Sequence, residues 1–362
     1  MGVQVDGTSG LIVHSEAPLN AEPPLARLRS AFLTPQSDFY IRSHGDTPRL
    51  DAATHRISVD GVPHPQTFTL AELQSRFAHR TVTAVMQCAG NRRADMQAVA
   101  PVSGDPWAAG AIGNAAWTGV ALSDVLRESG LELRAGLHVA FACADQCEME
   151  GKSFRFGASI PIEKAMSPDV LLAWALNGEG LAPAHGHPLR VVVPGYAGVR
   201  SPKWLASITV QDTPSDNPIQ ADDYKLFPSS WTKETADPAR GLTINEMPVN
   251  AAICEPAAHA RLKAGGNRVA GYAVATARAI VRVDVSADEG RSWQQAELQA
   301  DSSSPWSWKL WQAELDLPPG EHVLAVRAWD QAGQTQPNRP EETWNYKGYL
   351  CTAWHRVPVS VA

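Results

Sequence analysis

One cysteine stands where its sulfur could take part in chemistry. Cys88 ends an apolar, strand-like stretch and is followed by a tight turn over residues 89–91 and by Arg92 and Arg93. Guanidinium groups four and five residues away favour the thiolate, the form of cysteine that attacks electrophiles or binds a soft metal. We therefore take Cys88 as the first candidate for function.

Three interpretations of Cys88 remain open on the residues alone. It could be a buried structural cysteine, but two arginines are poor neighbours in an apolar core because each cation needs a partner. It could be a nucleophile beside an anion-binding arginine, although residues 89–91 offer few backbone amides to cradle an anion. It could be a thiolate ligand to a metal. No nearby Cys or His has zinc or iron–sulfur spacing, so a cofactor would supply most of the other ligands.

Length and charge limit the class of protein. The 362 residues favour two domains with separate cores. A net charge of −7 gives no general attraction to nucleic acid or to an anionic membrane, and no apolar run reaches membrane-spanning length. The first residues, Met1–Gly7, lack a basic or apolar leader pattern, and the five cysteines have no disulfide spacing. We expect a cytoplasmic protein.

The chain divides into two regions of different pattern. From about residue 55 to 212, strand-like runs alternate with short helical patterns, which predicts a mixed α/β domain. The predicted helices are 70–77 and 122–128, and the predicted strands are 80–87, 138–144, 189–193 and 205–210.

Residues 213–240, rich in Pro, Asp and Ser, form an ordered connector between the two regions, and we set the domains at 1–236 and 237–362. After residue 241 short alternating runs predict a β-hairpin over 279–298 and strands at 322–329 and 354–359. Seven of the twelve tryptophans fall in this region, as expected for the core of an immunoglobulin-like sandwich. The predicted fold class is α+β, with a mixed α/β domain followed by an all-β sandwich.

The segment Met86-Gln87-Cys88-Ala89-Gly90-Asn91-Arg92-Arg93 resembles the molybdenum-ligand segment of the sulfite oxidase family, which includes the molybdenum domain of assimilatory nitrate reductases. Other segments resemble this family in the same order along the whole chain. They are residues 20–24, 39–44, 107–112, 157–161, 185–195, 200–204, 224–225 and 354–357.

The resemblance implies a molybdenum–molybdopterin cofactor with one pterin dithiolene per molybdenum and Cys88 as the protein ligand to the metal. A cofactor phosphate needs cations, and a pterin edge needs acceptors and donors. On their own, Arg190 would be a solubilising strand charge and Asp145 a turn residue. The family's cofactor contacts carry over onto Tyr40, Ile41, Arg42, Ser43, His44, Asp145, His185, Arg190, Ser201, Pro202 and Lys203.

The resemblance also implies a substrate pocket, in which Arg42, Arg93 and Tyr224 surround a small oxyanion such as sulfite. Lys347 departs from the family pattern, because sulfite-oxidising members usually have arginine there and nitrate reductases have methionine. Lysine keeps the charge and loses the bidentate geometry of arginine. We therefore expect an anionic sulfur substrate that binds with altered affinity.

The implied reaction is oxidation of sulfite to sulfate by oxo transfer, with two electrons passed to an external acceptor, either oxygen or a separate cytochrome. No CxxCH motif or cytochrome module is present, so we expect a heme-free enzyme. The resemblance further implies a homodimer formed through the C-terminal domain. The alternatives are reduction of another oxo-anion or a sulfoxide on the same cofactor, and a molybdopterin-carrying subunit without catalysis.

Overall fold

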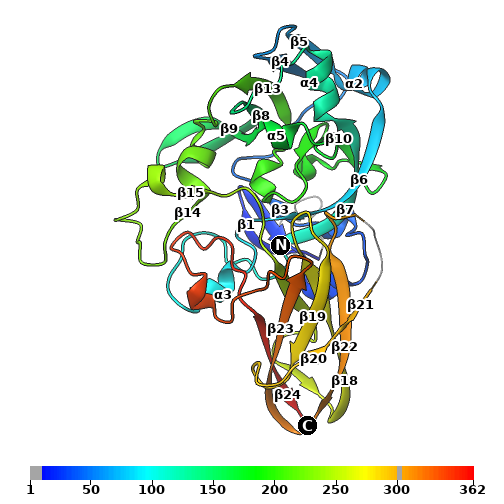
Figure 1. Cartoon of the computed structure of the whole chain (residues 1–362), viewed down its shortest axis with the longest axis vertical. Coiled ribbons are helices and arrows are strands. Elements are labelled where there is room, and N and C mark those ends of the chain that lie inside the picture. The colour runs from blue at the N-terminus through cyan, green and yellow to red at the C-terminus, as the bar shows by residue number, and fades with distance from the viewer. Residues whose placement is uncertain (1–9, 300–303) are drawn as a thin grey trace, which may run out of the picture.

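Two bodies of sheet structure follow one another along the long axis of the molecule in the computed structural model, which describes residues 10–299 and 304–362 (Figure 1). The C-terminus lies at the far tip of the second body. The segment Met1–Gly7, on which the expected location depends, lies outside the described residues. None of the described helices is long and apolar enough to cross a bilayer.

The N-terminal domain contains two five-stranded sheets and a small three-stranded sheet. The first has the order β11-β10-β7-β6, with β12 also paired to β10. The second has the order β5-β4-β13-β8-β9, and the small sheet has the order β1-β2-β3. The strands are β1 (Ile12–Glu16), β2 (Leu19–Glu22), β3 (Ile41–Arg42), β4 (Arg56–Asp60), β5 (Gln66–Thr69), β6 (His79–Gln87), β7 (Ile112–Ala121), β8 (His138–Met149), β9 (Lys152–Pro161), β10 (Leu171–Leu176), β11 (Glu179–Gly180), β12 (Arg190–Val192) and β13 (Leu205–Gln211).

The short helices α2, α4 and α5 pack against these sheets, whereas α1 packs against strands of the C-terminal domain. The helix α2 begins at a capping box, in which the Thr69 hydroxyl accepts from the Glu72 amide at 3.1 Å and the Glu72 carboxylate accepts from the Thr69 amide at 2.8 Å. Leu73 of α2 and Leu126 of α4 are fully buried in the core between the sheets. The helices are α1 (Leu25–Arg29), α2 (Leu70–Arg76), α3 (Arg93–Gln97), α4 (Leu122–Glu128) and α5 (Ile162–Ala165).

The predicted elements of this domain are confirmed with small shifts in their bounds. Helix α4 has the predicted bounds, and β6 and β13 each extend one residue beyond theirs. Strand β8 runs to Met149 instead of ending at 144, because β9 continues to pair with it after an irregularity between Ala142 and Gln146. Strand β12 is shorter than predicted.

The C-terminal domain is a β-sandwich, and the α+β fold class is confirmed. Its sheets have the orders β16-β18-β22-β21 and β17-β24-β23-β19-β20, and their inner faces form one apolar core. The small pair β14-β15 lies in the connector region. The strands are β14 (Lys225–Leu226), β15 (Leu242–Thr243), β16 (Asn250–Glu255), β17 (Ala260–Leu262), β18 (Gly265–Val274), β19 (Ile280–Ser286), β20 (Gln294–Gln295), β21 (Glu297–Leu298), β22 (Lys309–Leu317), β23 (Gly320–Asp330) and β24 (His355–Val361). The expected domain boundary at 236/237 stays a prediction.

Two expectations for this domain are corrected. The predicted hairpin over 279–298 is short, because the chain crosses between the sheets at buried Ala296, so that β20 pairs with β19 while β21 pairs with β22. Among the seven tryptophans, Trp308 and Trp311 are fully buried and the other five are half-buried. The indole faces of Trp293, Trp329 and Trp354 instead pack around the guanidinium of Arg327.

Candidate active site

The turn after β6 delivers Cys88 to a cavity. The Cys88 amide donates to the Ala111 carbonyl at 2.9 Å, and the Asn91 amide donates back to the Cys88 carbonyl at 3.0 Å, which closes the turn. Arg92 then takes a left-handed conformation with φ 67°, and α3 begins at the next residue. Cys88 is 5 % exposed, and it lines the cavity rather than the packed core alone.

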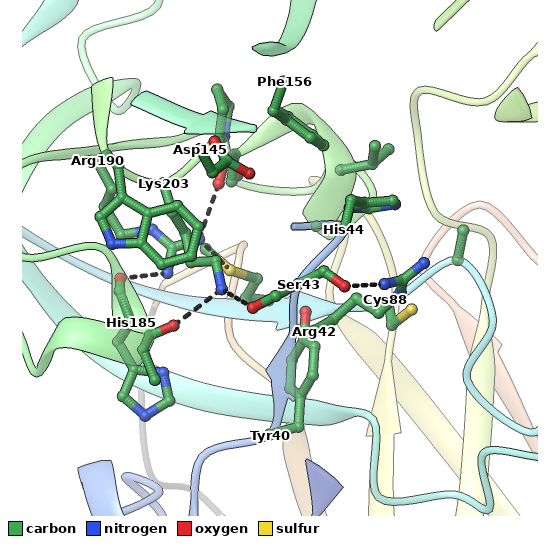
Figure 2. A pocket seen from close by; sticks show the side chains of 18 of the residues that line it. Tyr40, Arg42, Ser43, His44, Cys88, Asp145, Phe156, His185, Arg190 and Lys203 are labelled. Carbon is green, nitrogen blue, oxygen red and sulfur yellow. Dashed lines mark hydrogen bonds between the residues drawn. The ribbon is translucent and has the colours of Figure 1, made fainter. Parts of the chain in front are cut away.

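The cavity is lined by apolar side chains together with a few charged and polar ones, the composition of a site for a cofactor or other small organic molecule. Figure 2 shows Cys88 and Arg42 at one end in this view, with Asp145, His185, Arg190 and Lys203 toward the other. The lining residues are Phe39, Tyr40, Arg42, Ser43, His44, Met86, Cys88, Ala89, Asp145, Phe156, Ala184, His185, Arg190, Gly198, Val199, Ser201, Pro202, Lys203, Trp204 and Tyr224.

Two cations at the second end are held by neutral groups. Arg190, 4 % exposed, donates to the carbonyls of His185 at 2.9 Å and Ser201 at 2.8 Å. Lys203 donates to the Ser43 hydroxyl at 2.7 Å and to the Ala184 carbonyl at 2.9 Å. Burial lowers the pKa of Arg190 to about 10, and burial together with Arg190 lowers the pKa of Lys203. Neither cation forms an ion pair within the described residues, so this end of the cavity fits an anion.

Asp145 offers an acceptor at the same end. It lies inside β8, where the pairing with β9 shifts, and not at the strand end as expected. Its Oδ1 atom is buried and has no hydrogen-bond partner among the residues that the structure describes. Burial raises the pKa of this carboxyl group. A buried acceptor without a partner is costly, so the geometry calls for a donor on a bound molecule.

A glycine allows His185 and Arg190 to converge. His185 ends a 3-10 turn, and Gly186 follows with φ 106°. A Cβ atom at Gly186 would lie 3.0 Å from the Arg190 Cβ. Burial lowers the pKa of His185 to about 3, with Lys203 and Arg190 adding to the effect, so the imidazole is neutral at physiological pH and can hydrogen-bond to a neutral ring edge.

At the other end, Arg42 of β3 and Cys88 lie together. The Arg42 guanidinium donates to the Ser43 carbonyl (Figure 2) and, at 3.4 Å, to the Asn20 side chain. Burial raises the pKa of the Cys88 thiol, although Arg42 and Arg93 act in the opposite direction. The expectation that neighbouring arginines make Cys88 a thiolate is therefore corrected. A bound metal would displace the thiol proton, whereas a free nucleophile would have to ionise unaided.

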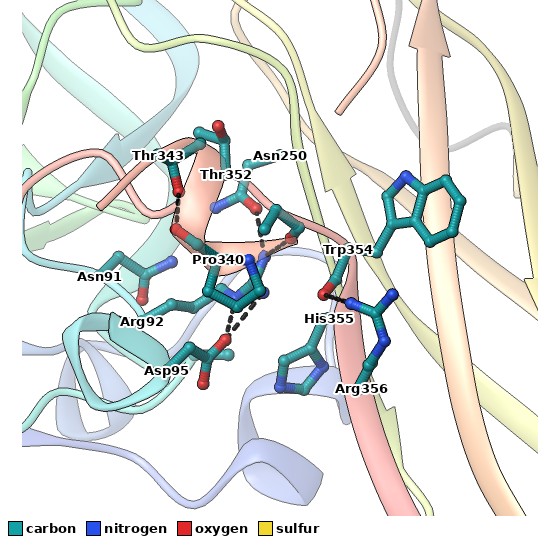
Figure 3. Close-up of polar contacts among 12 residues, drawn as sticks. Asn91, Arg92, Asp95, Asn250, Pro340, Thr343, Thr352, Trp354, His355 and Arg356 are labelled. Carbon is teal, nitrogen blue, oxygen red and sulfur yellow. Dashed lines mark hydrogen bonds and ion pairs between the residues drawn. The ribbon is translucent and has the colours of Figure 1, made fainter. Parts of the chain in front are cut away.

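Arg92 has a different role from the one expected. Its guanidinium forms an ion pair with Asp95 at 2.7 Å and donates to the Asn250 side chain at 3.1 Å and to the Ala353 carbonyl at 2.6 Å (Figure 3). Asn250 and Ala353 belong to the C-terminal domain. Arg92 therefore anchors the turn after Cys88 to that domain, because its partners draw the charge away from the sulfur.

Tyr224 reaches the cavity from the connector. Its hydroxyl hydrogen-bonds to His44 Nε2 at 2.9 Å, and the His44 ring lies 5.2 Å from the Phe156 ring. Burial raises the pKa of the Tyr224 phenol and lowers that of His44, so both groups are neutral. The neutral phenol can donate a hydrogen bond to an anion in the cavity.

Three predicted site residues do not line the cavity. Ile41 is 2 % exposed and precedes Arg42 in β3. Arg93 donates to the carbonyls of Asp105 at 3.0 Å and Gly348 at 3.3 Å. Lys347 forms an ion pair with Asp223 at 2.8 Å, next to Tyr224. Their assigned roles stay predictions.

Several lining residues were given no role from the sequence. Met86 accepts from Arg190 at 3.0 Å through its sulfur, and the Trp204 ring lies under the Lys203 ammonium at 4.2 Å. Gly198 makes room for Tyr40, because a Cβ there would lie 2.7 Å from the phenol oxygen. Phe156 carries a weak signal, since it alternates with Phe154 along β9. The other three are apparent only once the chain is folded.

The donor set fits a molybdopterin. A thiol stands at one end, and cations with an unpartnered carboxylate oxygen stand at the other, as a metal linked to an anionic, hydrogen-bonding organic group requires. No three His, Cys, Asp or Glu side chains within residues 10–299 and 304–362 are grouped to hold a metal ion by themselves. Cys88 would hold the metal, while Asp145, His185, Arg190 and Lys203 would hold the organic part.

The fold and the site define a molybdopterin-dependent oxidoreductase. Residues 44–219 match the family described as "Oxidoreductase molybdopterin binding domain", and residues 242–362 match "Mo-co oxidoreductase dimerisation domain". The chain belongs to the sulfite oxidase family. It is 42 % identical to sulfite oxidase of Gallus gallus over 96 % of this chain and 77 % of that protein, and 39 % identical to sulfite oxidase of Arabidopsis thaliana over 96 % and 93 %.

Other comparisons agree with this membership. The chain is 36 % identical to the nitrate reductase of Hordeum vulgare over 95 % of this chain, but it spans only 41 % of that protein. Several other animal sulfite oxidases are longer, and the chain spans 62–66 % of their length. The crystal structure of the sulfane dehydrogenase SoxCD from Paracoccus pantotrophus matches 100 % of this chain and 93 % of that chain, with a TM-score of 0.81 and 25 % identity.

Proposed function

We propose that this chain oxidises sulfite to sulfate at a molybdenum–molybdopterin cofactor and passes two electrons to an external acceptor. One observation carries the proposal. A buried thiol and a guanidinium, Cys88 and Arg42, meet at one end of a cavity whose other end holds unpaired cations and the unpartnered oxygen of Asp145. Relatives named sulfite oxidase support the choice of substrate.

Bound molybdenum would supply the oxygen atom for transfer and accept the two electrons. The chain itself would bind and orient the oxyanion. Among the neighbouring cations, Arg42 acts most strongly to lower the pKa of the Cys88 thiol, and its guanidinium would attract sulfite and stabilise charge that develops on the sulfite oxygens. The Tyr224 hydroxyl, oriented by His44, would donate a hydrogen bond to a substrate oxygen.

The test is turnover by protein made in a host that synthesises the cofactor. Molybdenum and pterin are quantified, and sulfite oxidation is measured with oxygen and with a c-type cytochrome as acceptors. Nitrate and a sulfoxide are offered in parallel with a reduced viologen dye as electron donor. We expect sulfite-dependent reduction of an acceptor in proportion to bound molybdenum.

Each alternative has its own outcome. Reduction of nitrate or of the sulfoxide without sulfite oxidation would replace sulfite oxidation with the reductive alternative. Bound cofactor without any turnover would indicate a carrier subunit. Turnover by protein without molybdenum would indicate thiolate chemistry at Cys88.

Further parts of the proposal concern the assembly. We propose a homodimer formed through the C-terminal domain, which the match to a dimerisation domain supports. Sedimentation that shows a monomer at micromolar concentration would contradict it. We also propose that the chain acts without heme and in the cytoplasm. An absorption spectrum of the purified protein and fractionation of the source cells test these two points.

A further inference from the structure

Tyr349, a residue of the C-terminal domain, contacts the groups predicted to bind the substrate. Its ring stacks on the Tyr224 ring with centroids 4.9 Å apart and planes 15° apart. The Arg93 guanidinium lies over the Tyr349 ring, 5.3 Å from the ring centroid. Its hydroxyl donates to Asp223 Oδ1 at 3.2 Å, the same oxygen that accepts from Lys347 at 2.8 Å. One side chain thus contacts Tyr224 and Arg93 directly and Lys347 through Asp223.

The loop that carries Tyr349 is tightly fixed. Asn345, which is fully buried, accepts from the Tyr349 amide at 3.1 Å and donates to its carbonyl at 2.7 Å. The Leu350 amide donates to the Ala89 carbonyl at 2.8 Å. Gly348 has φ 65°, and a Cβ there would lie 2.7 Å from the Arg93 Cγ. This loop therefore places Tyr349 against the turn that carries Cys88.

We infer that Tyr349 is a positioning residue, whose ring holds Tyr224 and Arg93 in the geometry that binds the oxyanion. It does not line the cavity, so it acts through these two side chains. Ring stacking restricts the rotation of Tyr224, and the ring face of Tyr349 attracts the Arg93 cation. The C-terminal domain would then shape the substrate site as well as the dimer.

The charge balance around Tyr349 explains why a ring suits this position. Arg93 forms no ion pair within the described residues, and its donors reach only backbone carbonyls. The ring attracts the cation without neutralising it, whereas a carboxylate would cancel the charge intended for the substrate. An aliphatic side chain would leave the guanidinium and the Tyr224 ring free to move.

The inference rests on the proposed function, and its test separates the two. Tyr349→Leu removes the ring, and Tyr349→Phe removes only the hydroxyl. Trp293→Leu removes a ring of the same domain that packs on Arg327 and Trp354 and does not line the cavity. All variants are prepared with cofactor, and molybdenum content is measured first. Steady-state sulfite kinetics and calorimetric binding of inorganic sulfate to the oxidised, molybdenum-loaded enzyme are then compared with the wild type.

We expect Tyr349→Leu to lower kcat/KM for sulfite by about tenfold to a hundredfold, mainly through KM, and to weaken sulfate binding in parallel. Tyr349→Phe should stay within about threefold of the wild type, because stacking and the cation–π contact remain. Trp293→Leu should keep the wild-type KM and sulfate affinity.

The inference is overturned if molybdenum-loaded Tyr349→Leu keeps wild-type KM and sulfate affinity. It is also overturned if Tyr349→Phe loses tenfold or more, because the ring would then not be the part that matters, and this holds even if Tyr349→Leu fails to fold. Absence of sulfite turnover in the wild type would reject the proposed function, while the sulfate binding data would still test Tyr349.

Discussion

The amide of Leu350 donates a hydrogen bond to the carbonyl of Ala89 at 2.8 Å. Ala89 follows the candidate metal ligand, and Leu350 belongs to the C-terminal domain. Together with the Arg92 contacts (Figure 3), this bond holds the turn after Cys88 against the C-terminal domain. The domain contact therefore reaches the candidate active site, and substitutions on either side of it have predictable effects.

Substitution of Cys88 tests the metal-ligand assignment. Cys88→Ser should leave the fold and the bound pterin in place, because Asp145, Arg190 and Lys203 are unchanged at the far end of the cavity. Sulfite turnover should fall by about a hundredfold or more, since a hydroxyl is a poor replacement for a soft thiolate ligand. Pterin content, molybdenum content and turnover are measured together. Full turnover in this variant would reject the assignment.

Substitution of Lys347 tests its role in substrate binding. Lys347→Met removes a positive charge beside Tyr224 and leaves Asp223 without its ion-pair partner. We expect KM for sulfite to rise by about tenfold with little change in kcat, because the charge acts on substrate binding. Lys347→Arg keeps the charge and is the control. An unchanged kcat/KM in Lys347→Met would show that this lysine does not act on the substrate.

Arg92 should be important for stability. Its guanidinium is fully buried, and Arg92→Met would leave the Asn250 side-chain oxygen and the Ala353 carbonyl without their donor. We expect the free energy of unfolding to fall by about 2 to 4 kcal/mol. Urea denaturation checks this, with Arg127→Met as control, because Arg127 lies on the surface and its ion pair with Asp124 is exposed to solvent. Equal midpoints for the two variants would contradict the anchoring role.

His355 should make stability depend on pH. Its Nδ1 accepts from the Ile253 amide at 3.0 Å, and burial, aided by Arg92, lowers its pKa to about 4. In the unfolded state the pKa of this histidine is about 6.5. Between these two pKa values the unfolded state takes up a proton that the folded state does not. Stability is therefore full above about pH 6.5 and falls by about 3 kcal/mol as the pH drops to about 4.

The matched variant for this prediction is His355→Asn, whose amide oxygen can still accept from Ile253 but does not titrate. Urea unfolding at several pH values should show a shallower loss of stability in this variant. His79→Asn, an exposed site, should keep the wild-type pH dependence. If His355→Asn and the wild type lose stability in parallel, another group is responsible.

Local patterns in the sequence predicted the elements that carry the site. Strand β6, which ends immediately before Cys88, and helices α2 and α4 were predictable because apolar periodicity acts over a few neighbours. Strand β18 was not predicted. Glycines weaken its strand signal, and its pairing with β16 and β22 depends on residues far away in the chain.

The chemistry of the candidate site was less predictable than its residues. The family resemblance named most of the residues that line the cavity, but spacing placed Arg92 beside the sulfur, where its partners Asp95 and Asn250 do not allow it to be. Proximity of charge also predicted an ionised Cys88, whereas burial has the larger effect on its pKa. Tyr349 carried no signal, because its contacts form only when the two domains pack together.

The loop from Asn345 to Leu350 has a consequence for chimeric enzymes. Exchange of the C-terminal domain between relatives would ordinarily be designed to change only how the subunits associate. In this chain the exchanged segment would bring its own residues at positions 347 and 349, and with them a different environment for Tyr224 and Arg93. A recombinant with a foreign C-terminal domain would inherit part of the donor's substrate preference.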